Sequence, residues 1–172
     1  MFTNLFSFKK KNELIERYSL RQIPLFSALS ASELKNICCK VKLIEFKKND
    51  IIYRQGDSVE SFYIILSGRC RVYVTQSNKS DRTLAYLHKG DYFGEVSLLS
   101  GKKHAANIEA INDSVVISIA KADFFDMIHS IPSVSFQISR RLGMRIKKLY
   151  ESDIYQTNTK IISLVQLSSQ KN

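Results

Sequence analysis

Apolar and polar residues alternate with a period of two over much of the chain from Val41 to Ala120, and short polar turns interrupt the pattern. Alternation of this kind predicts β-strands, because successive side chains of a strand point to opposite faces. The expected strands are Val41–Phe46, Ile51–Arg54, Phe62–Leu66, Arg69–Thr75, Thr83–His88, His104–Ile111 and Val115–Ala120, with a further strand ending at Tyr92-Phe93. Many short strands divided by turn residues predict a small antiparallel barrel or sandwich of eight strands.

The stretch Arg69–Thr75 alternates most cleanly. Its inward residues would be Cys70, Val72 and Val74, and its outward residues would be Arg69, Arg71 and Tyr73.

Helical patterns precede the strands. A short amphipathic helix is expected over Asn12–Arg21, with Pro24 ending it and Leu25-Phe26 forming an apolar anchor. Ser30 and Glu33 have the spacing of a capping box, which predicts a helix from Ala31 to about Lys40. One face of that helix would carry Leu34, Ile37 and Cys38.

Two helices are expected after the strands. The first covers Lys121–His129, and Ile131-Pro132 ends it. The second starts near Pro132 and runs to about Asp153. Its apolar stripe consists of Val134, Ile138, Leu142, Ile146 and Leu149. This stripe either packs against the strands or forms the seam of a homodimer.

Composition limits the function classes. The 172 residues are 44% hydrophobic, which suits one domain with appendages, and 26 basic against 16 acidic residues give a net charge of +10. That charge fits an anionic partner such as a nucleotide, a phospholipid surface or a nucleic acid, or simply a solvated basic surface. No apolar run approaches the roughly 20 residues of a transmembrane helix. The three cysteines form no secreted disulfide pattern, so we expect reduced thiols and a cytoplasmic location.

The candidate chemistry lies between Tyr92 and Ile108. Here Phe93-Gly94-Glu95 precedes a single apolar turn, Val96–Leu99, which stops at Ser100-Gly101. The amides of Glu95, Val96 and Ser97 would point one way and form an anion site. The chain has no nucleophile beside a base, no phosphate-binding Gly-x-x-x-x-Gly-Lys loop and no short metal-ligand spacing among its histidines. We therefore expect neither an enzyme, nor a metal site, nor a tightly bound cofactor.

Phe-Gly-Glu-x-x-Leu-Leu, followed by a small-residue strand opening, resembles the phosphate-binding cassette of cyclic nucleotide-binding domains, as in catabolite-activator-type regulators and kinase regulatory subunits. The resemblance covers about residues 20–150. It implies a mainly β fold with flanking helices (α+β): an antiparallel jelly-roll β-barrel with N-terminal helices, a short cassette helix and C-terminal hinge or lid helices.

In that family the glutamate accepts the ribose hydroxyl, amides of the short helix bind the cyclic phosphate, and an arginine nine residues after the glutamate clamps it. This chain has His104 at the arginine position. The ligand-binding residues that the resemblance implies are Phe93, Gly94, Glu95, Val96, Ser97, His104 and Ala105, with Leu84 as a candidate wall of the base pocket. Alternatively, Glu95 merely caps its helix and Leu84 is an ordinary strand residue.

Strand parity places His104 on one face with Ala106, Ile108 and Ala110, so its side chain should point into the barrel mouth. A histidine is shorter than an arginine and mostly neutral at pH 7. Lys102 and Lys103 would supply the missing charge if their loop folded inward.

The predicted organisation is a basic segment and helix at 1–20, a cyclic nucleotide-binding-like barrel at 21–131, a lid or dimer helix at 132–155 and a tail or linker at 156–172. The leading hypothesis is a regulatory domain that senses cyclic AMP or cyclic GMP and signals through its C-terminal helices to an output domain or partner protein. The alternative is a degenerate, non-binding fold that acts as a protein-interaction or scaffold module. A basic surface module for membrane or nucleic acid is a third hypothesis. Too few residues follow the barrel for a helix-turn-helix DNA-binding domain, so none is expected.

Overall fold

The computed structural model describes residues 20–77, 79–147 and 150–151. The chain forms two compact units, residues 1–135 and 136–172. The first unit contains all the described strands and the candidate site.

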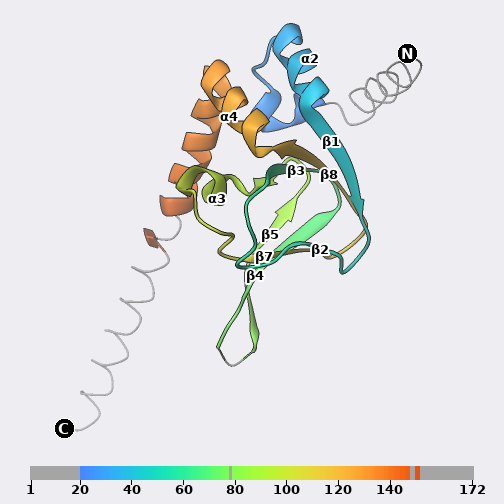
Figure 1. The fold of residues 1–172 in the computed structure, drawn as a ribbon, viewed down its shortest axis with the longest axis vertical. Coiled ribbons are helices and arrows are strands. Elements are labelled where there is room, and N and C mark those ends of the chain that lie inside the picture. The colour runs from blue at the N-terminus through green and yellow to red at the C-terminus, as the bar shows by residue number, and fades with distance from the viewer. Residues whose placement is uncertain (1–19, 78, 148–149, 152–172) are drawn as a thin grey trace, which may run out of the picture. The chain divides into compact units, whose positions relative to one another are not determined.

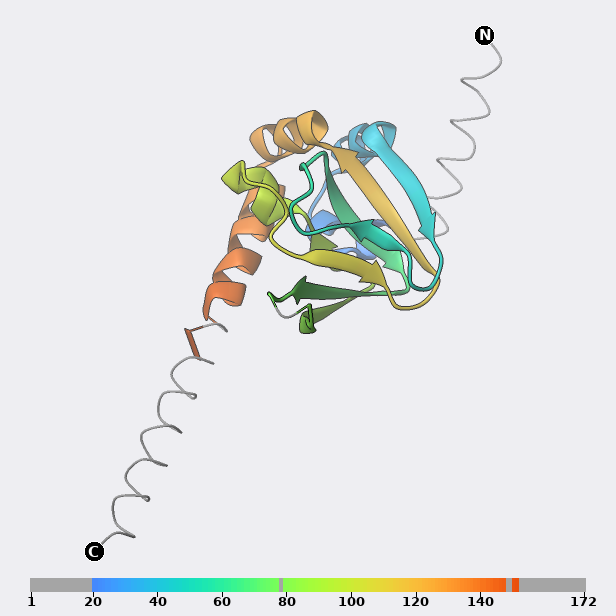
Figure 2. The ribbon, with the colours of Figure 1, turned by 60° about the horizontal axis from the view of Figure 1, so that its bottom comes forward.

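Eight described strands form two four-stranded antiparallel sheets in the first unit. The strands are β1 Val41–Phe46, β2 Ile51–Tyr53, β3 Ser61–Ser67, β4 Arg69–Thr75, β5 Asp81–His88, β6 Tyr92–Phe93, β7 Asn107–Ala110 and β8 Ser114–Ala120. One sheet has the order β1-β8-β3-β6 and the other β2-β7-β4-β5 (Figures 1 and 2). The predicted jelly-roll is confirmed, although the strands form two separate sheets rather than one closed barrel.

The core lies between the sheets. Ile65, Phe93 and Val116 come from the first sheet, and Cys70, Leu87 and Ile108 come from the second. Burial of such side chains supplies the main driving force for folding, about 1.5–3 kcal/mol for each large apolar residue.

The alternation predicted for β4 is confirmed for Cys70, which belongs to the core cluster, and for Val72, which is partly buried and packs against that cluster. Tyr73 was expected to face outward, yet only 7% of its surface is accessible. The Arg71 guanidinium carbon lies 4.2 Å from the centre of the Tyr73 ring and covers it. An outward strand position is therefore buried by its neighbour on the same face.

The described helices before the strands are η1 Leu20–Gln22, η2 Pro24–Phe26 and α2 Ala31–Lys40. The capping box is confirmed: the Glu33 amide donates to the Ser30 hydroxyl (3.2 Å) and the Ser30 amide donates to the Glu33 carboxylate (2.7 Å). The predicted inward face of α2 is also confirmed, because Leu34, Ile37 and Cys38 are buried. Most of the helix predicted over Asn12–Arg21 falls outside the described residues.

We expect Ser30→Ala to lower the free energy of unfolding by about 1 kcal/mol, because two helix-end amides lose their capping arrangement. Urea denaturation followed by circular dichroism measures this change. Asn36→Ala, at an exposed position of the same helix, is the matched control and should not destabilise the protein. Equal stabilities of the two variants would contradict a stabilising role for the box.

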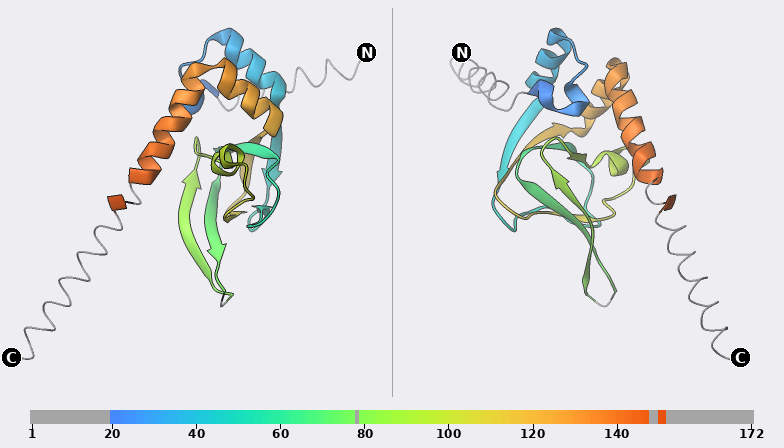
Figure 3. Two further views of the ribbon diagram at one scale, coloured as in Figure 1. Left: turned by 60° about the vertical axis from the view of Figure 1, so that its left-hand side comes forward. Right: turned by 180° about the vertical axis from the view of Figure 1, so that it is seen from behind.

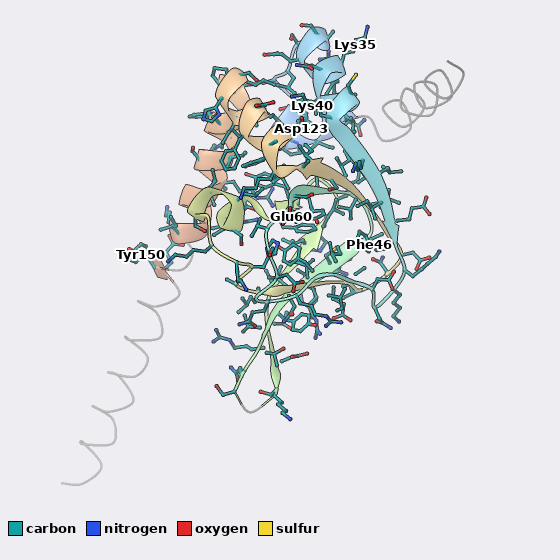
Figure 4. All side chains as sticks on the ribbon, viewed as in Figure 1. Lys35, Lys40, Phe46, Glu60, Asp123 and Tyr150 are labelled. Carbon is teal, nitrogen blue, oxygen red and sulfur yellow. The ribbon has the colours of Figure 1, made fainter. Side chains whose placement is uncertain are left out.

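Helix α4, Lys121–Ser130, lies beside α2 (Figures 1 and 4). The Lys40 ammonium group at the end of α2 is 3.3 Å from the Asp123 carboxylate and 3.1 Å from that of Asp126. These carboxylates raise the pKa of Lys40. Strands β1 and β8 pair from Val41 opposite Ile119 onward, so the chain enters and leaves the sandwich at one edge.

The β4–β5 hairpin extends away from the rest of the sandwich (Figures 1 and 3). All residues of β5 except Leu87 are exposed. A register shift lies opposite Val72 and Tyr73, where Val72 pairs with Ala85 and Tyr73 with Thr83. Leu84 is the extra residue of this bulge.

A helix occupies residues 132–147, as predicted from Pro132, and residues 150–151 are also helical. Its expected end near Asp153 lies outside the described residues. Within the described part of the chain, no helix combines the length and apolarity needed to cross a membrane.

Candidate ligand-binding site

The site begins where β6 passes into a short helix, α3 Glu95–Ser100. Gly94 joins them with φ of +92°, a left-handed conformation that favours glycine. A Cβ atom on Gly94 would lie 2.9 Å from the carbonyl oxygen of Ser61 in β3. Both the backbone conformation and the available space therefore require glycine before α3.

Helix α3 is one residue longer at each end than the turn predicted over Val96–Leu99. It begins with a hydrogen bond from the Leu98 amide to the Gly94 carbonyl (3.1 Å), and it ends at Gly101, whose amide approaches the Leu98 carbonyl (3.4 Å). Val96 and Leu99 are exposed, so the inward side of the helix is formed by Glu95, Ser97 and Leu98.

Glu95 is the most deeply buried carboxyl side chain of the described residues, with 1% of its surface accessible. Carboxylates are seldom buried unless they are hydrogen-bonded or charge-paired. Its place in the first turn also suits the positive end of the helix dipole.

His104 is 4% accessible and lies in the segment before β7. The strand predicted over His104–Ile111 is therefore wrong at its start, since β7 begins at Asn107, and strand parity does not set the direction of His104. Tertiary hydrogen bonds hold this residue instead: its amide donates to the Asp57 carbonyl (3.1 Å), and its carbonyl accepts from the Gly56 amide (2.7 Å).

The His104 ring stacks on the Tyr53 ring, with 3.6 Å between ring centres and 11° between ring planes. Tyr53 also contacts Phe93 and Tyr63, with ring centres 5.8 and 5.9 Å apart. Burial lowers the pKa of His104, and the nearby Asp57 carboxylate only partly opposes this effect. The imidazole is consequently neutral at pH 7.

The pKa shift of His104 predicts a pH dependence of stability. Because the folded protein disfavours the imidazolium, the unfolded chain takes up this proton first as the pH falls. We expect the His104 contribution to the free energy of unfolding to be complete above about pH 6.5 and to decline at lower pH. Denaturation series from pH 8 to pH 5 should show this decline, and His104→Gln should remove it. His129→Gln, at an exposed position, is the control that should leave the slope unchanged.

Two residues of the site were not expected from the sequence. Tyr53 provides the surface on which His104 packs. The β2–β7 pairing and the hydrogen bonds of His104 to Gly56 and Asp57 bring the two rings together. Asn107 is buried, and its side-chain oxygen accepts from the Gln55 amide (2.9 Å) while its amide group donates to the Tyr73 carbonyl (3.3 Å). Asn107 thus ties the 54–57 turn to β4 and β7.

The structure groups the predicted site residues unevenly. Four of them are buried around the start of α3: Phe93, Gly94, Glu95 and Ser97. The Tyr53 ring lies between His104 and this group, since it contacts the rings of both His104 and Phe93. Leu84 is 49% exposed in β5, and Ala105 is exposed beside His104. Lys102 and Lys103 are exposed as well. In the described part of the chain, no group of three or more potential metal ligands occurs.

The family model described as "Cyclic nucleotide-binding domain" matches residues 43–130, just over half of the chain. The chain belongs to the cyclic nucleotide-binding domain family. The matched range contains Glu95, His104 and every described strand except the first two residues of β1. The family consists of regulatory rather than catalytic domains, and its ligands are cyclic AMP and cyclic GMP.

Individual relatives agree with this assignment. A cAMP-dependent protein kinase regulatory subunit of Blastocladiella emersonii is 37% identical over 101 residues, which cover 59% of this chain and 25% of that protein. The cyclic AMP receptor protein of Thermus thermophilus is 28% identical over 125 residues, which cover 73% of this chain and 58% of that protein. The crystal structure of the Thermus thermophilus catabolite activator protein has a TM-score of 0.70 and 28% identity, and the match covers 77% of this chain and 63% of that one. The chain therefore spans only part of the length of these relatives.

Proposed function

We propose that this domain is a non-catalytic regulatory sensor for a ligand of the cyclic AMP or cyclic GMP class. The Glu95 carboxylate accepts hydrogen bonds from the ribose hydroxyls, and the Val96 and Ser97 amides face the ligand. His104 stands where the family has its phosphate-clamping arginine, so the contact to the cyclic phosphate is weak.

One observation carries this proposal: a carboxylate is buried to 1% accessibility at the start of a six-residue helix. A helix this short is not stable by itself. Removing a carboxylate from water costs free energy, so its burial does not by itself stabilise the core. Binding of ligand hydroxyl groups would give a function both to the buried Glu95 carboxylate and to the short helix that carries it.

The described helix at 132–147 is the proposed transmitter. A ligand shifts a conformational equilibrium only by the difference between its affinities for the two states. Ligand contacts that favour one arrangement of this helix would therefore pass the signal to an output domain or partner protein.

The competing function is a scaffold that kept the fold and lost its ligand. The packing of His104 on Tyr53, together with the near-complete burial of His104, favours this alternative function. Direct binding separates the two functions.

We expect cyclic AMP or cyclic GMP at saturating concentration to slow amide hydrogen exchange in residues 133–147. Glu95→Gln should weaken this binding, while Glu45→Gln, an exposed change of the same charge in β1, should not. Calorimetry measures the affinities, and exchange mass spectrometry measures the helix. Binding without any change in exchange would refute transmission through the helix, and equal affinities of the two variants would refute the role of Glu95.

A further inference from the structure

Strand β5 is the outermost strand of the second sheet, since the order β2-β7-β4-β5 ends with it. It belongs to the hairpin that extends away from the sandwich (Figures 1 and 3), and Leu87 is its one buried residue. The outermost strand of a sheet leaves a row of backbone N–H and C=O groups without a strand partner. β5 therefore has a free edge to which a further strand can be added.

The direction of the backbone groups in β5 follows from the pairing of β4. The Ile111 amide donates to the Arg69 carbonyl (3.0 Å), so the backbone of Arg69 bonds away from β5, on the side of β7. Alternate residues of an antiparallel strand bond to the same side. Arg71 thus also bonds toward β7, and its β5 partner Tyr86 makes no backbone bond to β4. The N–H and C=O groups of Tyr86 consequently point to the free edge.

The free edge is short, because both of its ends depart from a regular strand. At one end the His88 amide donates to the Asp91 carboxylate (2.8 Å), and the His88 carbonyl accepts from the Asp91 amide (2.9 Å). At the other end the bulge at Leu84 interrupts the regular alternation. An added strand would pair regularly over only a few residues around Tyr86, so side-chain contacts must supply much of its binding energy.

Apolar and basic side chains surround this edge. Leu84 and Tyr86 are 49% and 50% exposed. The Arg69 guanidinium carbon lies 5.8 Å from the centre of the Tyr86 ring, so a cation adjoins the exposed aromatic surface. Three further exposed cations belong to the hairpin or follow it directly: Lys79, Arg82 and Lys89.

The carboxylates of the hairpin leave these cations available. Asp81 lies 3.7 Å from Arg71, and Asp91 bonds to the turn that ends β5. No carboxylate of the described residues forms an ion pair with the exposed cations Arg69, Lys79, Arg82 and Lys89. An acidic partner would gain contacts here without breaking an existing ion pair, whereas a second copy of this chain would bring the same cations to the edge and be repelled.

We propose that the free edge of β5 binds an extended acidic segment of a partner protein as an added strand. The backbone of the segment exchanges hydrogen bonds with Tyr86, its apolar side chains pack on Leu84 and Tyr86, and its carboxylates pair with the exposed cations. A nucleic acid fits less well, because the edge presents C=O acceptors beside its N–H donors and a phosphate oxygen only accepts. This docking surface uses none of the buried residues around α3, so it stands or fails separately from the proposed function.

The test uses the full chain and two labelled synthetic peptides of about ten residues, one alternating Glu with Val and the other alternating Lys with Val, at pH 7.5. Fluorescence anisotropy should show that the acidic peptide binds about tenfold or more tightly than the basic one. Arg69→Glu should weaken binding of the acidic peptide, while Lys35→Glu, the same charge change at an exposed position of α2, should not.

A second pair of variants isolates the backbone contact. Tyr86→Pro removes the ring and the edge N–H group but no hydrogen bond to β4, and proline is tolerated in edge strands. Tyr86→Val removes the ring alone, so Tyr86→Pro should bind the acidic peptide more weakly than Tyr86→Val does. Hydrogen exchange needs no substitution: the acidic peptide should slow exchange in residues 81–88 and leave residues 41–46, the edge strand of the other sheet, unchanged.

The results that would overturn this inference are specific. Equal affinities of the two peptides, or no binding of the acidic peptide up to about 1 mM, would overturn it. Slowed exchange in residues 41–46 in place of 81–88 would put the peptide at the wrong edge. A dimer of the unaltered chain that Tyr86→Pro dissociates would show that a second copy occupies the edge, and binding of oligouridylate in preference to the acidic peptide would identify a nucleic-acid surface. Each of these results leaves the affinity for cyclic AMP or cyclic GMP to be judged by its own measurement.

Discussion

Replacing His104 with arginine should raise the affinity for cyclic AMP by about ten- to a hundredfold at pH 7, because each hydrogen bond to a charged group contributes about 1.5–3 kcal/mol. Arginine supplies a permanent charge and a planar fork that matches two phosphate oxygens. The backbone position is already fixed by the hydrogen bonds to Gly56 and Asp57. The new guanidinium can also stack on the Tyr53 ring, and this contact would replace the stacking of the His104 imidazole.

Thr83→Arg adds the same charge on the exposed β4–β5 hairpin and controls for net charge, so its affinity should match that of the unaltered chain. The pH dependence gives a second check. In the unaltered chain the imidazole must take up a proton to pair with phosphate, so affinity for cyclic AMP should rise as the pH falls from 8 to 5. In His104→Arg it should stay level. Tight, pH-independent binding by the unaltered chain that also survives His104→Ala would show that Lys102 or Lys103 holds the phosphate.

Gly68→Ala should lower the free energy of unfolding by about 3 kcal/mol or more, because a strained backbone and a steric overlap act together. Gly68 joins β3 to β4 with φ of +89°. A Cβ atom there would lie 2.2 Å from the Ser114 hydroxyl oxygen, 2.6 Å from the Ser114 Cα and 2.7 Å from the Asp113 carbonyl oxygen. Two of these atoms belong to the backbone, so the clash cannot be relieved by rotating a side chain.

Gly56→Ala is the matched control for this substitution. Gly56 has nearly the same φ, +90°, but nothing lies within 4 Å of its added Cβ. It should cost only the conformational strain, about 1–2 kcal/mol. Urea denaturation of both variants isolates the steric part as their difference. Equal free energies of unfolding for the two variants would mean that the turns at Gly68 and Ser114 can move apart without loss of stability.

The sequence predicted those elements whose determinants are local. The period-two pattern located every described strand except β6 to within a few residues, and the capping box at Ser30 and Glu33 marked the first turn of α2. The Gly94-Glu95 junction was likewise visible as a motif, because the positive φ of Gly94 itself requires glycine at this position.

The sequence did not predict contacts that depend on register or on distant loops. His104 owes its burial to hydrogen bonds with Gly56 and Asp57 and to the Tyr53 ring, all about fifty positions earlier in the chain. The bulge in the β2–β7 pairing, between Ile51 and Tyr53, shifts the register of that contact. No local pattern encodes such a shift. Strand parity predicted correctly that His104 is buried, but for the wrong reason, because His104 lies outside the strand.

The pairing of β1 with β8 has a mechanical consequence. These strands are antiparallel along their whole paired length, and Val41 and Ile119 lie opposite each other where the chain enters and leaves the sandwich. Tension applied through α2 and α4 would first load the Lys40 ion pairs to Asp123 and Asp126. It would then break the β1–β8 hydrogen bonds one after another from this end, instead of loading all of them at once in shear. The fold would therefore yield to pulling along its own chain at low force, whatever its resistance to heat or denaturant.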